Sequence, residues 1–422
     1  MKKQYLLILF ILFSFRSIGQ ELDYAKEIIS NLCSEKFAGR GYEKNGNKYA
    51  AKYIRNELIA NGLQKFDDDF FQEFDISVNT FPSAMSVEID KNELIPGIDY
   101  LVAPSSNSCK GKFQIAWINK KVVEHENALF NMLSHDLTEY FLAIDTIGIT
   151  NDDILYLLEM ILDSNMVNAK GIIEITKKNL IYGKSQTVKN FPLIQIKKGK
   201  IDYDNKFITV KIKNKFEQNY TTQNIIAYVK GETDSFIVFT SHYDHLGMMG
   251  KNAYFPGAND NASGVAMNLN FAKYFAGLEE KPHYSYAFMF FSAEELGLLG
   301  SKYYVKSPFF DLSKIKFLIN IDMVGSGDKG IKIVNGSVLK NYFQKIVDIN
   351  QKHNYLKKVF PRGESANSDH YYFYREGVKS IFIYTLGEYK EYHNIFDKSE
   401  VLPFSEYEDL FRLLRDFTQS LN

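Results

Sequence analysis

The stretch Phe236-Ile237-Val238-Phe239-Thr240-Ser241-His242-Tyr243-Asp244 joins a run of strand-forming residues directly to a histidine and an aspartate. The apolar runs 284–291 and 315–321 are similar, because each also passes into acidic side chains. The acidic residues that follow them are Glu294, Glu295 and Asp322. Strands of an α/β sheet bring such residues together at the carboxyl edge of the sheet. The pattern therefore predicts one site built from several strand ends.

Helical patterns alternate with these apolar runs in the second half of the chain. They cover about 262–277, 295–306, 338–352 and 404–420, and a further apolar run lies at 380–384. Residues 21–62 also show helical periodicity, which ends at Gly62. Such alternation is typical of an α/β domain with a mixed, largely parallel sheet and helices on both faces.

The region from about 78 to 215 has a different character. Short strands and turns replace the alternation, and one helix, opened by Asn151-Asp152-Asp153, interrupts them. We therefore predict two parts. Residues 20–77 and 216–422 form the main domain, and residues 78–215 form a smaller, β-rich inserted domain.

The first nineteen residues have the pattern of a signal peptide. Lys2 and Lys3 precede the apolar run 5–15, and small residues follow at Ser17 and Gly19. The run is shorter than the ~20 residues that span a bilayer. We expect an exported, soluble protein, periplasmic or extracellular, with no membrane attachment after cleavage.

The composition is that of a globular protein, with 45% hydrophobic and 24% charged residues. The net charge is −1, and removal of Lys2, Lys3 and Arg16 makes it −4. Without a basic surplus, nucleic acid and anionic membranes are not expected partners.

Cysteine chemistry is limited to Cys33 and Cys109. They allow one disulfide or two buried thiols, and both readings stay open. Two thiols do not form a cysteine-rich metal site, so His, Asp and Glu must hold any metal.

Histidine and carboxylate ligands without thiolates favour zinc in a hydrolytic site, with manganese or cobalt as substitutes. A pair of divalent ions ~3.5–4 Å apart needs one shared carboxylate. Asp260 lies in the small-residue loop 256–264 at the start of a helix, and we predict that it is the shared ligand. His393, which follows Tyr392, is the candidate for the last ligand.

Together these segments resemble peptidase family M28, the zinc aminopeptidases. The motifs that carry the resemblance are His242-Tyr243-Asp244, the loop 257–264, Glu294-Glu295-Leu296-Gly297, the segment 320–325 and Tyr392-His393. Gly39-Arg40-Gly41 and the helix around Ala50-Ala51 also resemble the opening of this family. The resemblance covers roughly 22–76 and 224–420, and it implies the zinc exopeptidase fold.

The resemblance implies two Zn²⁺ ions per chain. His242 and Asp322 would hold one ion, and Glu295 and His393 would hold the other. Asp260 would bridge the two ions. A non-proline cis peptide bond after Asp260 is also implied.

Further residues receive roles from the same comparison. Glu294 would be the general base that takes a proton from the metal-activated water. Asp244, two residues past His242 on an extended segment, would fix the tautomer of that imidazole. Tyr392 would donate its hydroxyl to the tetrahedral oxyanion, with simple packing as the alternative.

Two further residues, His245 and Asp369, are not predicted to be metal ligands. His245 is expected on the opposite strand face from His242, where it packs or supports a ligand. Asp369 is a candidate contact of the substrate amine, with a structural role in its loop as the alternative.

The segments 168–175 and 191–196 resemble parts of the protease-associated domain found in many family members. This domain would be a lid or a structural appendage.

The predicted function is the release of N-terminal residues from peptides. The alternatives are a carboxypeptidase on the same metal site, a glutaminyl-cyclase-like acyl transferase with a single zinc, and a binding module without metals.

Overall fold

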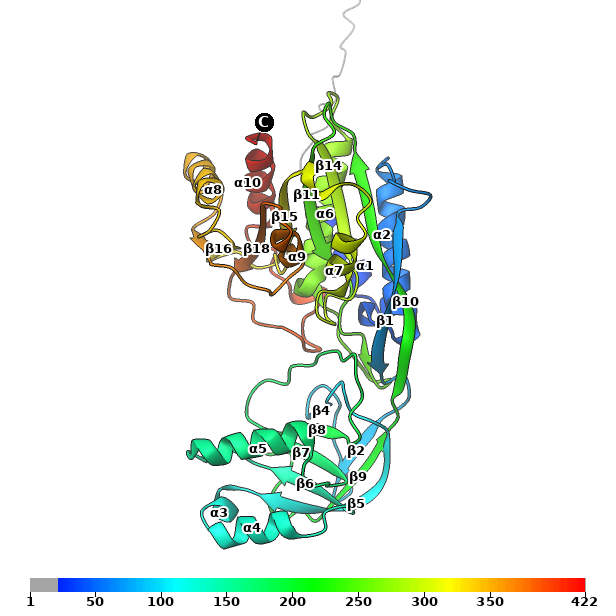
Figure 1. The fold of residues 1–422 in the computed structure, drawn as a ribbon, viewed down its shortest axis with the longest axis vertical. Coiled ribbons are helices and arrows are strands. Elements are labelled where there is room, and N and C mark those ends of the chain that lie inside the picture. The colour runs from blue at the N-terminus through cyan, green and yellow to red at the C-terminus, as the bar shows by residue number, and fades with distance from the viewer. Residues whose placement is uncertain (1–21, 422) are drawn as a thin grey trace, which may run out of the picture.

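The computed structural model describes residues 22–421 of the chain. The predicted signal peptide, residues 1–19, lies outside the described residues. Figure 1 shows two units along the long axis, and the long strand β10 (Lys215–Val229) leads from the lower unit into the upper one. Within residues 22–421, every helix is too short or too polar to cross a bilayer.

The upper unit is built on an eight-stranded mixed sheet in the order β1-β10-β14-β11-β15-β18-β16-β17. Its four central strands are parallel, namely β14 (Ser285–Phe291), β11 (Phe236–His242), β15 (Ile315–Ile321) and β18 (Ser380–Leu386). The outer strands are β1 (Phe71–Thr80), β16 (Gly330–Val334) and β17 (Val359–Pro361). β1 and β10 pair antiparallel on one side of the sheet, and β16 pairs antiparallel with β18 on the other.

Helices cover both faces of this sheet, which confirms the predicted fold class. One face carries α1 (Leu22–Leu32), α2 (Gly46–Ala60), α6 (Ser263–Ala276) and α10 (Tyr407–Gln419), with α8 (Lys340–His353) beside α10. The other face carries α7 (Leu299–Lys306) and α9 (His370–Arg375). Side chains of the central strands alternate between the two faces, so Phe239 and Val238 belong to different apolar clusters.

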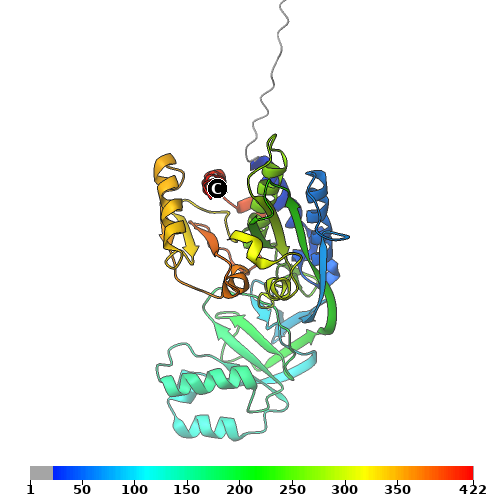
Figure 2. The same cartoon turned by 45° about the horizontal axis from the view of Figure 1, so that its top comes forward.

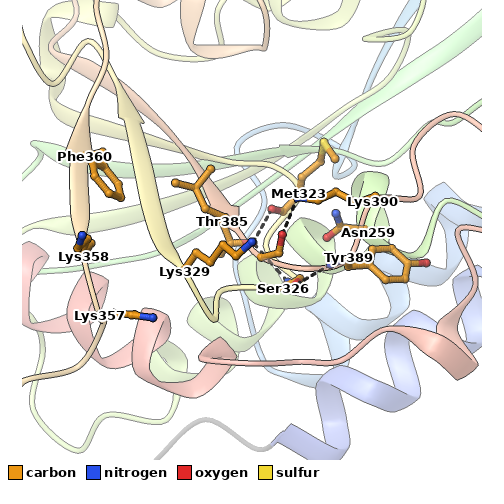
Figure 3. Close-up of a pocket in the computed structure, with 12 residues that line it drawn as sticks. Asn259, Met323, Ser326, Lys329, Lys357, Lys358, Phe360, Thr385, Tyr389 and Lys390 are labelled. Carbon is orange, nitrogen blue, oxygen red and sulfur yellow. Dashed lines mark hydrogen bonds between the residues drawn. The ribbon is translucent and has the colours of Figure 1, made fainter. Parts of the chain in front are cut away.

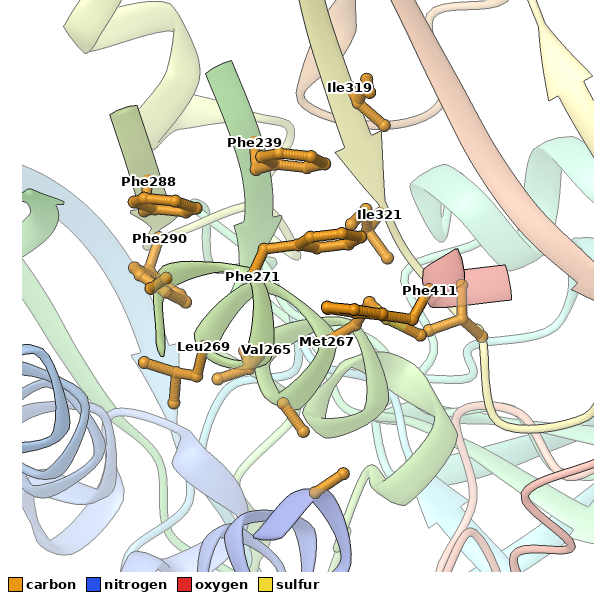
Figure 4. Close-up of a cluster of buried hydrophobic side chains, with 14 of the residues drawn as sticks. Phe239, Val265, Met267, Leu269, Phe271, Phe288, Phe290, Ile319, Ile321 and Phe411 are labelled. Carbon is orange, nitrogen blue, oxygen red and sulfur yellow. The ribbon is translucent and has the colours of Figure 1, made fainter. Parts of the chain in front are cut away.

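The core beneath α6 is aromatic (Figure 4). Phe271 stacks on Phe239 and on Phe411, with ring centroids 4.2 and 4.3 Å apart. All three rings are buried. This packing fixes α6 on β11, and it therefore fixes the turn before α6 relative to the end of that strand.

The predicted strands and helices of this unit are present, with shifts at two helix ends. The helix predicted at 295–306 begins only at Leu299, because Leu298 has a left-handed backbone (φ 60°). The helix predicted at 404–420 begins at Tyr407, because Phe404 and Glu406 both have positive φ. Left-handed residues interrupt a right-handed helix, and the apolar pattern does not reveal them.

The lower unit, residues 81–214, contains a second eight-stranded sheet in the order β3-β2-β9-β5-β6-β7-β8-β4. Its strands are β2 (Ser86–Ile89), β3 (Asn92–Glu93), β4 (Tyr100–Val102), β5 (Cys109–Ile118), β6 (Tyr140–Ile144), β7 (Gly171–Thr176), β8 (Leu193–Lys197) and β9 (Phe207–Ile212). The strands from β5 to β8 are parallel.

Three helices accompany this sheet, so the unit is mixed α/β rather than β-rich alone. They are α3 (Lys120–Val123), α4 (Glu126–Ser134) and α5 (Asp152–Ser164). In Figure 2 they lie together at the bottom, on one side of the sheet. As the sequence indicates, Asn151 caps α5, because its side-chain oxygen accepts a hydrogen bond from the Ile154 amide at 3.1 Å.

The two units share a hydrophobic contact. Leu246, Met249 and Phe255, from the loop after β11, pack into the core of the lower unit. Tyr182 of the lower unit stacks on Phe255, with ring centroids 4.6 Å apart. The lower unit is therefore packed directly against the chain that follows His242.

Cys33 and Cys109 are both buried, free thiols. Cys33 lies just after α1 in the upper unit, whereas Cys109 begins β5 in the lower unit. Of the two readings that the sequence left open, the structure has the unpaired one.

Candidate metal centre

The predicted ligands meet at the carboxyl edge of the upper sheet. His242 ends β11, Asp322 follows β15, and Glu295 lies in the turn after β14. Asp260 lies in the turn before α6, and His393 lies in the loop after β18. Two groups have ligand atoms within 4.8 Å of one another: His242 with Glu294 and Asp322, and His245 with Asp260 and Glu295.

Asp260 lies between two imidazoles. Its Oδ1 is 3.3 Å from Nε2 of His242, and its Oδ2 is 3.0 Å from Nε2 of His393. Nε2 of His242 is also 3.4 Å from Oδ1 of Asp322, and Nε2 of His393 is 3.2 Å from Oε2 of Glu295. The structure thus brings the five ligand candidates together in two halves that share Asp260.

The other ring nitrogen of each histidine faces a main-chain oxygen. Nδ1 of His242 is 3.1 Å from the carbonyl oxygen of Asp244. Nδ1 of His393 is 3.1 Å from the carbonyl oxygen of Tyr182. A carbonyl oxygen can only accept a hydrogen bond, so each Nδ1 carries the proton and each Nε2 is free to bind a cation.

Asp244 holds His242 through its main chain, whereas the sequence predicted its carboxylate. Its Oδ1 is 3.9 Å from Nδ1 of His242, which is too far for a hydrogen bond. The strand ends at His242, and the chain turns so that the carbonyl of Asp244 faces the ring. The carboxylate instead accepts from the Glu294 amide at 3.1 Å and from the Tyr42 hydroxyl at 3.3 Å. Burial raises the pKa of Asp244 to about 7.

Arg40 organises the loops around the site from a fully buried position. Its guanidinium donates to main-chain oxygens of the two loops that carry His242 and Asp260, those of Tyr243 (2.9 Å), Pro256 (2.6 Å), Gly257 (2.7 Å) and Asp260 (3.2 Å). The rigid fork of the guanidinium suits several acceptors at once. Arg40 therefore connects these loops to the N-terminal segment.

The turn before α6 is also held from the C-terminal side. Asp397 accepts from the amides of Asn259 (2.9 Å) and Asp260 (3.0 Å). Gly257 has φ +61°, and a Cβ there would lie 2.2 Å from the main-chain oxygen of Asp260. Only glycine fits such a position. The peptide bond between Asp260 and Asn261 is cis, as the resemblance implied.

The histidines control the charge of the shared carboxylate. Burial alone would raise the pKa of Asp260, but the adjacent imidazoles of His242 and His393 hold it well below its usual value. Burial would lower the pKa of His393, but Glu295 and Asp260 raise it to about 11. Asp260 therefore stays ionised between two positive or metal-bound partners.

Glu294 lies beside the His242 half and lines the cavity above it. Removal from bulk water raises its pKa well above the usual value; His242 opposes this shift, and Glu295 and Asp369 add to it. Burial also raises the pKa of Asp369, to about 6. Carboxylates thus crowd this edge of the sheet and favour a cation there.

His245 lies in the site, although the sequence predicted the opposite strand face. Its Nδ1 is 2.8 Å from Oε1 of Glu295. The alternation of faces does not extend past the end of β11 at His242, so it does not apply to His245. The contact with Glu295 agrees with the predicted supporting role.

A cavity of about 310 Å³ opens over the metal centre. The ring of Tyr392 lines it and stacks on the imidazole of His393, with centroids 3.8 Å apart. Burial and the charges of Asp260 and Glu295 raise the pKa of Tyr392. A hydroxyl that keeps its proton can donate to an oxyanion, so the predicted role and simple packing both fit this position.

Sequence reasoning missed several residues around this cavity. Those that line it without having been predicted are Arg362, Asn367, Phe382 and Tyr384. Ser368 donates to Oδ2 of Asp322 at 3.0 Å, and Asp369 beside it is fully buried. The sequence predicted Asp369 as a candidate contact of the substrate amine, but nothing local in the sequence marks Arg362.

A second cavity, of about 550 Å³, adjoins the first through Met323, which lines both. Figure 3 shows the side chains around it, which include Lys329, Lys357, Lys358 and Lys390. Of the described residues that line it, none is Asp, Glu or His. It therefore lies outside the metal centre.

The donor set of the metal centre fits zinc. Imidazole nitrogens and carboxylate oxygens are zinc ligands, and hydrogen bonds to main-chain carbonyl oxygens orient both imidazoles here. Oδ1 of Asp322 is buried without a hydrogen-bond partner, and it faces Nε2 of His242. Two such unused lone pairs that converge in the interior are suited to a shared cation.

Comparison with known proteins agrees with this geometry. The sequence model described as Peptidase family M28 matches residues 224–418, which contain all five ligand candidates and Glu294. Residues 224–418 belong to peptidase family M28. Leucine aminopeptidase 2 of Arthroderma otae is 37% identical to this chain over 131 residues, or 31% of the chain. The match spans only 25% of that relative's own length.

Solved structures extend the likeness to both units. A zinc aminopeptidase from Bacillus subtilis has a TM-score of 0.71 and 21% identity, with 96% of each chain covered. A glutaminyl cyclase from Porphyromonas gingivalis has a TM-score of 0.51 and 13% identity, with 96% of this chain and 99% of the other covered. At these identities the likeness shows the fold, which the two activities share.

Arg40→Lys should destabilise the protein. Lysine keeps the charge but lacks the fork, so buried carbonyl oxygens would lose their donors. We expect a loss of roughly 2–4 kcal/mol in the free energy of unfolding, measured by urea denaturation. Arg55→Lys is the control, since Arg55 makes a partly exposed ion pair with Asp69 worth about 0–1 kcal/mol. Equal, small losses in both variants would contradict the role given to Arg40.

Proposed function

We propose that the protein is an aminopeptidase that uses two zinc ions to hydrolyse the first peptide bond of peptides. One observation carries the proposal: the two oxygens of Asp260 face two different imidazoles, each with its own carboxylate and with its Nδ1 proton fixed. A shared carboxylate with paired ligands on each side is the arrangement that a two-metal hydrolytic site requires.

The ligand assignment follows the two halves. His242 and Asp322 would hold one zinc ion, Glu295 and His393 would hold the other, and Asp260 would contact both. Zinc bound here would act as a Lewis acid that activates water and polarises the substrate carbonyl. The relatives named as leucine and zinc aminopeptidases support this chemistry.

Glu294 is the proposed general base. Its carboxylate lies in one group with His242 and Asp322, but those two residues and Asp260 would already supply three ligands to that zinc ion. The turn that carries it is held by the carboxylate of Asp244 through the Glu294 amide. From this position Glu294 takes a proton from the attacking water and returns it to the leaving amine.

A free N-terminus would be recognised through charge. Asp322 and Glu294 lie around the cavity, and the buried Asp369 lies next to Ser368, which contacts Asp322. Their negative field attracts an ammonium group.

We also propose that the protein is exported, because residues 1–19 have the pattern of a signal peptide. Its substrates would then be peptides outside the cytoplasm.

A carboxypeptidase is the second candidate, because Arg362 lines the same cavity. A guanidinium at the wall of the cavity could bind the free carboxylate of a peptide. Its Nη1 already donates to the Tyr384 hydroxyl at 3.2 Å, so it is held in place. The carboxylates outnumber this single cation around the metal centre, which favours N-terminal release.

The metal content should be two zinc ions per chain after mild preparation. Activity on an aminoacyl chromogenic amide should be lost with a chelator and return with zinc, because the five ligands would hold one zinc ion in each half of the site. Elemental analysis measures the ratio. A single ion at full activity would point to the cyclase-like alternative.

Glu294→Gln should lower kcat by ~10²–10⁴-fold while both zinc ions remain, since the amide keeps the shape but cannot accept the proton. Glu295→Gln should instead lower zinc occupancy, because it weakens a ligand. Steady-state kinetics together with metal analysis separates the two effects. Equal loss of metal in both variants would show that the division of roles is wrong.

Blocking each end of one short peptide distinguishes the two exopeptidase candidates. An N-acetylated copy should resist hydrolysis, because it lacks the ammonium, whereas a C-amidated copy should be cleaved like the free peptide. Chromatography of the products measures both. The reverse result would establish the carboxypeptidase, and cleavage of both copies would indicate an endopeptidase.

A further inference from the structure

One extended segment of the lower unit, residues 180–187 between β7 and β8, reaches the metal centre. We call this segment the strap. In Figure 1 the chain between β7 and β8 rises from the lower sheet toward the upper unit. We propose that the strap is a positioning element for His393, so that binding of the second zinc ion depends on the lower unit. The inference rests on the proposed two-zinc function.

Two hydrogen bonds join the strap to His393. The Tyr182 carbonyl accepts from Nδ1 of His393 at 3.1 Å, and the Tyr182 amide donates to the carbonyl oxygen of His393 at 2.9 Å. The first bond fixes the tautomer and the ring plane, and the second fixes the main chain. Together they aim Nε2 at Asp260 and Glu295.

The strap also reaches the turn that carries the other ligand of this half. The side-chain amide of Gln186 donates to the carbonyl oxygen of Leu296 at 2.6 Å. Leu296 directly follows Glu295. The strap therefore contacts His393 itself and the residue directly after Glu295, which are the two positions that supply the non-bridging ligands of the second half.

Three contacts fix the strap itself. Nζ of Lys184 is 2.9 Å from Oε1 of Glu43, and both side chains are only 1% exposed. The ring of Tyr182 stacks on Phe255, and the Ser185 carbonyl accepts from the Asn79 amide at 2.9 Å. An ion pair this deeply buried tolerates little displacement, since an unpaired Glu43 would carry a large desolvation penalty.

The two halves of the metal centre therefore differ in what supports them. His242 is oriented by Asp244, two residues away on its own loop. His393 is oriented by Tyr182, 211 residues away in the sequence and in the other unit. A change in the strap should consequently weaken one zinc site and spare the other, whereas general destabilisation would weaken both.

Lys184→Met tests this asymmetry, because it removes the ion pair without touching a zinc ligand. Lys198→Met is the matched control: Lys198 makes a 2.7 Å ion pair with the buried Asp145 inside the lower unit. Thermal melting first establishes that each full-length variant is folded. Competition with a chromogenic chelator then gives two zinc dissociation constants, and His393→Ala marks the constant that belongs to the second half.

We expect Lys184→Met to raise the constant of the second half about 10- to 100-fold, the usual effect of losing a neighbour that orients a ligand. The other constant should stay within about twofold, and Lys198→Met should change neither. Unchanged constants, or equal weakening of both, would overturn the inference.

Gln186→Ala keeps the test decisive if Lys184→Met does not fold. It removes one hydrogen bond from a largely exposed side chain, and it should also weaken only the second half. No change in that variant would overturn the inference. A wild-type chain that binds fewer than two zinc ions would instead overturn the proposed function, and the inference with it.

Discussion

The rest of the site depends on the carboxylate of Asp260, buried between two imidazoles. A buried carboxylate in that position is stable only if its turn is held firmly and both of its oxygens stay available for positive or metal-bound partners. Arg40 and Asp397 meet this need by binding the main chain of the turn, Arg40 at its carbonyl oxygens and Asp397 at its amides. Both oxygens of Asp260 are thereby left for Nε2 of His242 and Nε2 of His393.

Much of the fold was predictable because its signals are local. The run ending in His242 alternates between two buried faces, and such runs specify a central parallel strand. Helix ends were less predictable, as at Leu298 and Glu406, because single left-handed residues leave no mark in the apolar pattern. Four of the five ligand candidates could also be named from the sequence, since each lies within a few residues of a strand end or in a small-residue turn. His393 lies further past the end of β18, and the resemblance of Tyr392-His393 to the M28 motif supported its choice.

Long-range support of the ligands could not be predicted in the same way. The contact between Tyr182 and His393 uses main-chain atoms, which any residue at position 182 would provide. Asp244 illustrates the same limit, because its spacing from His242 suggested a carboxylate contact and the structure has a carbonyl contact. His245 shows that alternation of faces holds only as far as the strand continues. These features depend on how loops turn in three dimensions.

The central claim is that two metal ions lie on either side of Asp260. Diffraction from crystals of the zinc-loaded protein, collected at the zinc absorption edge, tests it most directly. The account predicts two anomalous peaks ~3.5–4 Å apart, one beside His242 and Asp322 and the other beside Glu295 and His393. A single peak, or peaks that do not contact Asp260, would contradict it.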